Sequence, residues 1–138
     1  MTSSAPDRPE AFVSLVIPSL SGGPDLLECV ASFVRIGDAD FEVIVSLGGP
    51  AEAGRRVEER FPGVRVLRAA GRRTLPELKA AGLRAARGDI VATTADYCTA
   101  SADWLVELRR GHLGEAVAIG GAMENRSTSR TIDWAAFF

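Results

Sequence analysis

The chain has 138 residues, enough for one domain with a sizeable core and too few for two. Its composition, 46% hydrophobic and 25% charged, is ordinary for a globular protein, and a net charge of −2 gives no overall field to attract nucleic acid or an anionic membrane. No apolar run approaches the roughly 20 residues of a membrane span, and the first ten residues lack the apolar core of a signal peptide. We therefore expect a cytoplasmic protein with no transmembrane segment that does not bind nucleic acid.

The first third of the chain predicts a lead-in, a buried strand and a helix. Residues 1–11 contain two prolines among serine and aspartate and predict a disordered lead-in. Residues 12–17 are β-branched and apolar in nearly unbroken succession, which predicts a strand buried on both faces and central in its sheet. After the loop 19–23, Pro24 fits the first turn of a helix that Gly37 stops.

The middle of the chain repeats this alternation. Residues 41–47 predict a second strand, which the turn 48–50 ends, and residues 51–61 predict a charged surface helix. A short strand over 64–67 is expected at the sheet edge, because Arg65 alternates with apolar neighbours.

The clearest local signature is a capping box at Thr74–Glu77, in which the Thr74 hydroxyl and the Glu77 carboxylate each satisfy a free backbone amide. It opens a helix that ends at Gly88, and the small residues on its inner face favour close packing on the sheet.

The last third begins with the stretch most relevant to function. Residues 89–94 predict a fourth strand that leads into a polar loop with a single carboxylate, Asp96. A helix over 101–110 follows, then a fifth strand over 116–120, a polar loop, and an apolar tail over 131–138.

This alternation of strands and helices predicts one α/β domain, a mainly parallel sheet with helices on both faces. In such sheets ligands bind beyond the carboxyl ends of the strands, so the Asp96 loop is the first candidate site. Cys29 and Cys98 are not spaced like a metal or redox motif, and we expect both to be reduced, Cys29 in a helix and Cys98 beside this loop.

Several segments, in order along the chain, resemble the family 2 glycosyltransferases, which have the GT-A fold. The segments are Val13–Pro18, Phe41–Val45, Gly82–Ala92, Asp103–Leu105 and Gly120-Gly121. The resemblance implies that residues 12–138 form a GT-A-like domain corresponding to the nucleotide-sugar-binding half of the family, without the half that binds the acceptor.

The resemblance also implies a site for a nucleotide-diphospho-sugar at the ends of the first, second and fourth strands. In the family, a DxD motif after the fourth strand holds a divalent metal on the diphosphate, and a later carboxylate deprotonates the acceptor hydroxyl. Carried onto this chain, it implies Mg²⁺ or Mn²⁺ as cofactor, with Asp96 as the metal ligand. The implied substrate-binding residues are Pro18, Ser19, Ser21, Ser46, Arg72 and Asp96.

The chain departs from the family pattern in three places. Ser46-Leu47-Gly48-Gly49 stands where the family has aspartates after the second strand, and Ala95-Asp96-Tyr97 stands where it has DxD. The chain also ends soon after the fifth predicted strand, and its remaining downstream carboxylates, Glu124 and Asp133, lie in no recognisable base motif.

Most candidate residues have an alternative, structural interpretation. Ser19, Ser21 and Gly22 either contact a nucleoside or form a plain strand-to-helix turn. Gly48-Gly49 could cradle a phosphate, although a turn is favoured, and Arg72 with Arg73 could meet a diphosphate, although a solvated turn is favoured.

Three further side chains are expected to be structural. Trp104 and Trp134 are interpreted as core residues rather than sugar platforms. His112 follows a helix end, where the helix dipole explains it without chemistry.

Two functions remain open. The first is a glycosyltransferase-like protein that binds a nucleotide-diphospho-sugar and transfers the sugar to an acceptor hydroxyl with metal assistance. The second is a catalytically inactive binding or assembly module. Its apolar ending, Trp134-Ala135-Ala136-Phe137-Phe138, would pack on a second copy or a partner chain.

Overall fold

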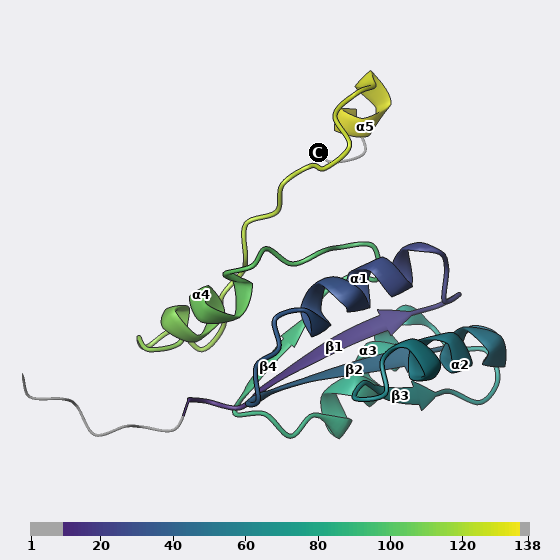
Figure 1. Cartoon of the computed structure of the whole chain (residues 1–138), viewed down its shortest axis with the longest axis horizontal. Helices are drawn as coiled ribbons and strands as arrows, with labels where there is room; N and C mark the ends of the chain where they lie inside the picture. Colours follow the sequence, from purple (N-terminus) through teal and green to yellow (C-terminus); the bar gives the residue numbers. More distant parts are fainter. Residues whose placement is uncertain (1–9, 136–138) are drawn as a thin grey trace, which may run out of the picture. The chain divides into compact units, whose positions relative to one another are not determined.

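The computed structural model describes residues 10–135 (Figure 1). The part of the predicted lead-in before residue 10 and the part of the predicted tail after residue 135 lie outside the described residues. The chain divides into two compact units between Leu105 and Val106. The elements in chain order are β1 (Val13–Ser19), α1 (Asp25–Val34), β2 (Phe41–Leu47), α2 (Ala51–Arg60), β3 (Arg65–Arg68), α3 (Leu75–Ala85), β4 (Ile90–Thr93), α4 (Trp104–Gly111) and α5 (Thr131–Ala135).

The first unit is built on a parallel four-stranded sheet in the order β3-β2-β1-β4. The predictions that the first strand is central and that β3 lies at an edge are confirmed. All seven residues of β1 are buried, as its unbroken apolar run predicts, and the strand continues through Pro18 to Ser19. In register, Val16 of β1 faces Ile44 of β2 and Thr93 of β4.

Helices cover both faces of this sheet, as predicted (Figure 1). On one face, Leu15 and Ile17 of β1 belong to a core cluster with Leu26 and Val30 of α1 and with residues of α2. On the other face α3 packs so closely on β1 that a Cβ atom at Gly82 would collide with the side chain of Val16. The small residues of α3 therefore set the distance between this helix and the sheet.

The capping box that opens α3 is also confirmed. The Thr74 amide donates to Glu77 Oε2 at 2.7 Å, and the Glu77 amide donates to Thr74 Oγ1 at 3.4 Å. The hydrogen bonds from Thr74 also lower the pKa of the Glu77 carboxyl. Two free amides at the helix start are thereby satisfied.

Among the described residues of the second unit, the prediction of a fifth strand over 116–120 is wrong. Val117 is fully exposed and no strand pairs with this segment, so its β-forming residues gain neither a hydrogen-bonded ladder nor burial. Trp134, expected in the core, is 42% exposed on α5, a short helix within the segment expected to be an apolar tail.

Trp104, by contrast, packs on the core of the first unit as expected. Its ring meets Phe33 edge to face with centroids 5.0 Å apart, and it lies 5.9 Å from the ring of Phe41. These contacts hold the start of α4 against α1 and β2.

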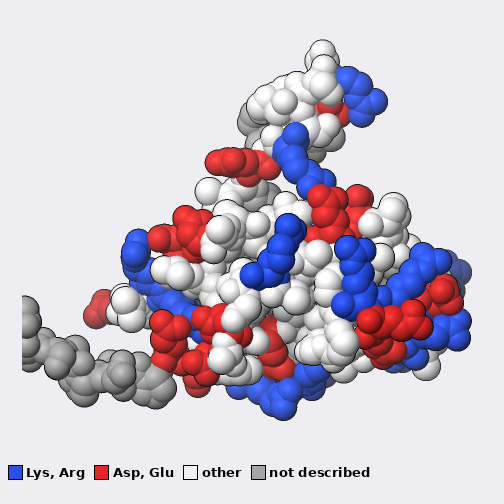
Figure 2. Space-filling model, in the orientation of Figure 1, with Lys and Arg blue, Asp and Glu red and all other residues white. Residues whose placement is uncertain are grey.

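The surface charge is mixed. Figure 2 shows Lys and Arg interleaved with Asp and Glu over the end of the first unit that carries α2 and β3. The pairs there include Arg55 with Glu52 at 2.7 Å and Arg68 with Glu58 at 2.6 Å. No helix within residues 10–135 has the length and apolar character needed to cross a membrane.

At the amino ends of the strands, Glu42 of β2 forms a network that joins several segments. Its carboxylate accepts hydrogen bonds from Ser14 at 2.7 Å and from Arg65 at 3.1 Å, and both the backbone and the guanidinium of Arg87 donate to it at 3.1 Å. The Ser14 hydroxyl in turn accepts from the Gly88 amide at 2.8 Å. Burial alone would raise the pKa of Glu42, but these hydrogen bonds outweigh it and hold the pKa below 4.5.

Glu42→Gln is expected to destabilise the protein by about 2–3 kcal/mol, because it removes charge-assisted hydrogen bonds from a side chain that is only 9% exposed. Urea unfolding at pH 7 measures the change. Glu52→Gln, in an exposed ion pair, is the control and should change little.

The same pair of proteins tests the pKa of Glu42. A lowered pKa contributes stability above pH 4.5 that is lost as the pH falls below it. The difference between wild type and Glu42→Gln should therefore shrink with acidification. A difference that is constant between pH 7 and pH 3 would contradict the assignment.

Candidate functional site

The loops that follow β1, β2 and β4 meet at the carboxyl edge of the sheet. The Gly48 amide, after β2, donates to the carbonyl of Ser19 at the end of β1, at 2.9 Å. From the other side, Asp96 in the loop after β4 accepts a hydrogen bond from Ser19 Oγ at 2.6 Å. The structure thus brings Ser19 and Asp96, two of the predicted site residues, into direct contact.

Ser19 has a different role from the one its sequence position indicates. The residue is fully buried, and its hydroxyl donates to Asp96 while accepting from the Gly22 amide at 3.1 Å. One side chain therefore fixes both the carboxylate and the first turn of the β1–α1 loop. In this geometry Ser19 is a positioning residue, and direct contact of its hydroxyl with a ligand stays a prediction.

Glycines allow the loops after β1 and β2 to pack backbone against backbone. A Cβ atom at Gly49 would lie 2.6 Å from the carbonyl carbon and oxygen of Ser21. Gly22 adopts a φ of +62°, in the left-handed region, and a Cβ there would collide with Ala53. This close approach explains why position 49 is a glycine. It lies in a tight turn, which is the interpretation favoured from the sequence.

The other predicted substrate-binding residues occupy different environments. Pro18 and Ser46 are paired neighbours in the sheet and both are buried. Ser21 is exposed on the loop beside Gly49, and Arg72 is exposed in the loop between β3 and α3. Because β3 and β4 are separated by three inter-strand steps, Arg72 and Asp96 follow strands about 14 Å apart.

Both cysteines contact the Asp96 loop; the sequence predicted this for Cys98 but not for Cys29. The Cys29 thiol, on α1, donates to the carbonyl of Ala95 at 3.6 Å, and the Cys98 amide donates to the same carbonyl at 3.1 Å. Burial first, and then the nearby Cys98 and Asp96, raise the pKa of Cys29 to about 12. Cys29 is therefore a neutral thiol that anchors the loop, and both cysteines are free, as expected.

The residues around Asp96 do not fit a divalent cation. Magnesium and manganese require several oxygen ligands, yet the neighbours of Asp96 in the chain are Ala95 and Tyr97, and neither side chain carries a carboxylate. Asp96 Oδ2 already accepts a hydrogen bond from the Ser19 hydroxyl. Across residues 10–135 there is no group of three or more His, Cys, Asp or Glu side chains placed to hold a metal ion.

The downstream carboxylate Asp133 is engaged locally. It accepts hydrogen bonds from the backbone and guanidinium of Arg130, both at 3.0 Å, and the guanidinium bond is the main cause of its lowered pKa. His112 Nδ1 contacts the carbonyl of Leu108 at 2.9 Å, in line with the structural role expected for it.

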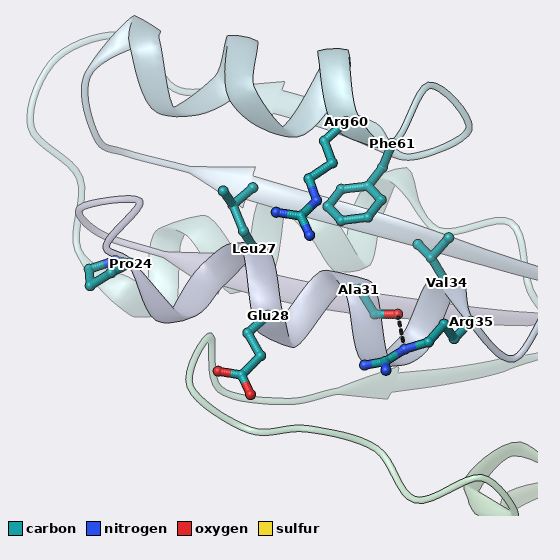
Figure 3. A pocket seen from close by; sticks show the side chains of 8 residues that line it. All are labelled: Pro24, Leu27, Glu28, Ala31, Val34, Arg35, Arg60 and Phe61. Atoms are coloured by element: carbon teal, nitrogen blue, oxygen red, sulfur yellow. Dashed lines mark hydrogen bonds between the residues drawn. The ribbon is translucent and has the colours of Figure 1, made fainter.

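A hollow in the described part of the first unit lies elsewhere. It has a volume of about 590 Å³ and is formed by α1 and the end of α2 (Figure 3). The Arg60 guanidinium lies 5.5 Å from the centre of the Phe61 ring, and Arg35 donates to the carbonyl of Ala31. Neither Ser19 nor Asp96 lines this hollow. The residues lining it are Pro24, Leu27, Glu28, Ala31, Val34, Arg35, Arg60 and Phe61.

Comparison with known proteins identifies relatives of this chain. Residues 14–136 match the family model described as glycosyl transferase family 2. A search of curated proteins finds no match.

Two solved structures share the fold. The mannosyltransferase PcManGT from Pyrobaculum calidifontis, in complex with GDP-Man and Mn²⁺, is 22% identical with a TM-score of 0.58, over 70% of this chain and 32% of its own. TarS from S. aureus, residues 1–349, is 14% identical with a TM-score of 0.63, over 82% of this chain and 38% of its own. The chain thus spans about a third of the length of each of these structures.

Ser19→Ala is expected to lower stability by about 1–3 kcal/mol, because it leaves the Gly22 amide and the Asp96 carboxylate without their shared partner. Hydrogen exchange should show faster exchange at the Gly22 amide. Ser21→Ala, at an exposed position in the same loop, is the control and should leave stability within about 0.5 kcal/mol of wild type. Unchanged protection of Gly22 in Ser19→Ala would contradict the positioning role.

Proposed function

The chain belongs to glycosyl transferase family 2, and from this premise we propose that it binds a nucleotide-diphospho-sugar at the carboxyl ends of β1, β2 and β4. The observation that carries the proposal is the hydrogen bond between Ser19 and Asp96, which fixes a carboxylate at the edge of the sheet where ligands bind in open α/β folds. The shared fold with a structure that holds GDP-Man supports the choice of ligand class.

Within this proposal, the ligand lies across the ends of the strands from β3 to β4. Asp96 meets it on the β4 side, Ser21 projects from the β1–α1 loop, and Arg72 meets it on the β3 side. Pro18 and Ser46, being buried, contribute by shaping the ends of β1 and β2.

The reaction we propose is transfer of the sugar to an acceptor hydroxyl, in the cytoplasm. Such a transfer uses a general base that takes the proton of the attacking hydroxyl. At the described site Asp96 is the one carboxylate identified, and it already accepts a hydrogen bond from Ser19. The present chain is therefore proposed to supply donor binding, and no base is assigned in it.

A second candidate function is an inactive binding or assembly module that acts with a second copy or a partner chain. The observation that favours it is the apolar surface of the second unit, where Val117 is fully exposed and Ile132 is 62% exposed. In this case too, the first unit would keep the fold of the family without its chemistry.

Isothermal titration calorimetry with a panel of UDP- and GDP-sugars in buffer containing MnCl₂ tests the leading proposal. We expect micromolar to millimolar binding of at least one nucleotide-sugar. Asp96→Asn should weaken it at least tenfold, because the amide keeps the shape of the side chain and removes the charge. Asp103→Asn, at an exposed position seven residues later, is the matched control.

The outcomes separate the two functions. Binding that Asp96→Asn weakens and Asp103→Asn does not would support the transferase proposal. The absence of heat with every nucleotide-sugar, from protein whose circular dichroism and melting are those of a folded domain, would overturn it and favour the assembly module.

A further inference from the structure

We propose that this chain binds its nucleotide-diphospho-sugar without a divalent cation, with Asp96 accepting hydrogen bonds from hydroxyl groups of the ligand and Arg72 meeting the diphosphate. The inference rests on the proposed function and concerns how the same site balances charge. It starts from a disagreement between the metal that the family resemblance implies and the side chains that the structure places around Asp96.

The first step is the donor set. In the family the DxD motif offers two carboxylates to the cation, and the charge of the cation offsets that of the phosphates. Here Tyr97, 69% exposed, and Ala95 flank a lone carboxylate. One oxygen of that carboxylate is bound to Ser19 at 2.6 Å, a distance typical of a strong charge-assisted hydrogen bond. Metal binding at this oxygen would compete with that bond.

The second step is the chemistry of Asp96 without a cation. A carboxylate only accepts hydrogen bonds, and it repels a diphosphate of the same sign. A nucleotide-sugar offers hydroxyl donors on its ribose and on its sugar. Because Ser19 occupies Oδ2, the remaining acceptor capacity of Asp96 matches these hydroxyl groups rather than the phosphates.

The third step is the source of positive charge. Arg72 is exposed in the loop that follows β3, and within the described residues it forms no ion pair. The adjacent Arg73 donates through Nε to the carbonyl of Ala70 at 3.1 Å, which braces this loop. An arginine fork binds phosphate oxygens in a bidentate manner, so Arg72 can supply the charge that the cation supplies elsewhere.

Calorimetry with the best-bound nucleotide-sugar tests the proposal in EDTA and in MnCl₂, with Mn²⁺ electron paramagnetic resonance as a second readout that does not depend on activity. We expect the same dissociation constant, within threefold, in both buffers. The resonance signal of free Mn²⁺ should also be undiminished by protein and nucleotide-sugar beyond what the nucleotide alone removes.

Variants test the two assigned residues. In EDTA, Asp96→Asn and Arg72→Ala should each weaken binding about tenfold. Arg84→Ala, an exposed arginine in the last turn of α3, should leave it unchanged. Inorganic diphosphate as competitor should lose affinity in Arg72→Ala and keep it in Asp96→Asn, since only Arg72 is assigned to the phosphates.

Binding that appears in MnCl₂ and is lost in EDTA would overturn this inference and leave the proposed function intact. Equal binding in both buffers that neither Asp96→Asn nor Arg72→Ala weakens would overturn the residue assignment. No binding in either buffer would overturn the proposed function itself, and this inference with it.

Discussion

The hydrogen bond from Ser19 to Asp96 is the constraint on which the candidate site depends. It joins residues 77 positions apart, the end of the central strand and the loop after β4, and it is made by a fully buried hydroxyl. Because the same hydroxyl accepts the Gly22 amide, the carboxylate and the β1–α1 loop are fixed relative to each other. A preorganised carboxylate of this kind binds with less ordering cost than a mobile one.

The other end of β1 is held by the same device. There the Ser14 hydroxyl accepts the amides of Arg87 and Gly88 and donates to Glu42. A side chain at Gly88 has no room, since its Cβ would lie 2.6 Å from the Ser14 amide nitrogen. Two buried serines thus tie the central strand to the segments before and after β4, which fixes how far the Asp96 loop projects beyond the sheet.

Sequence alone predicted those features that depend on local pattern. The unbroken apolar run of β1, the capping box of α3 and the edge position of β3 all follow from residues close together in the chain. The prediction of a fifth strand was wrong because β-forming residues at 116–120 form a strand only beside a partner strand, and the local sequence does not show whether one is present. The roles of Ser19 and Cys29 could not be predicted for a related reason, since both depend on contacts with a loop more than 60 residues away.

The most direct test of the account is an NMR titration of the ¹⁵N-labelled protein with a nucleotide-diphospho-sugar in EDTA. The account predicts that shift changes concentrate at residues 19–22, around Arg72 and at residues 95–98, where the loops after β1, β3 and β4 emerge. Changes confined to the hollow between α1 and the end of α2, or no changes at any ligand concentration, would contradict it.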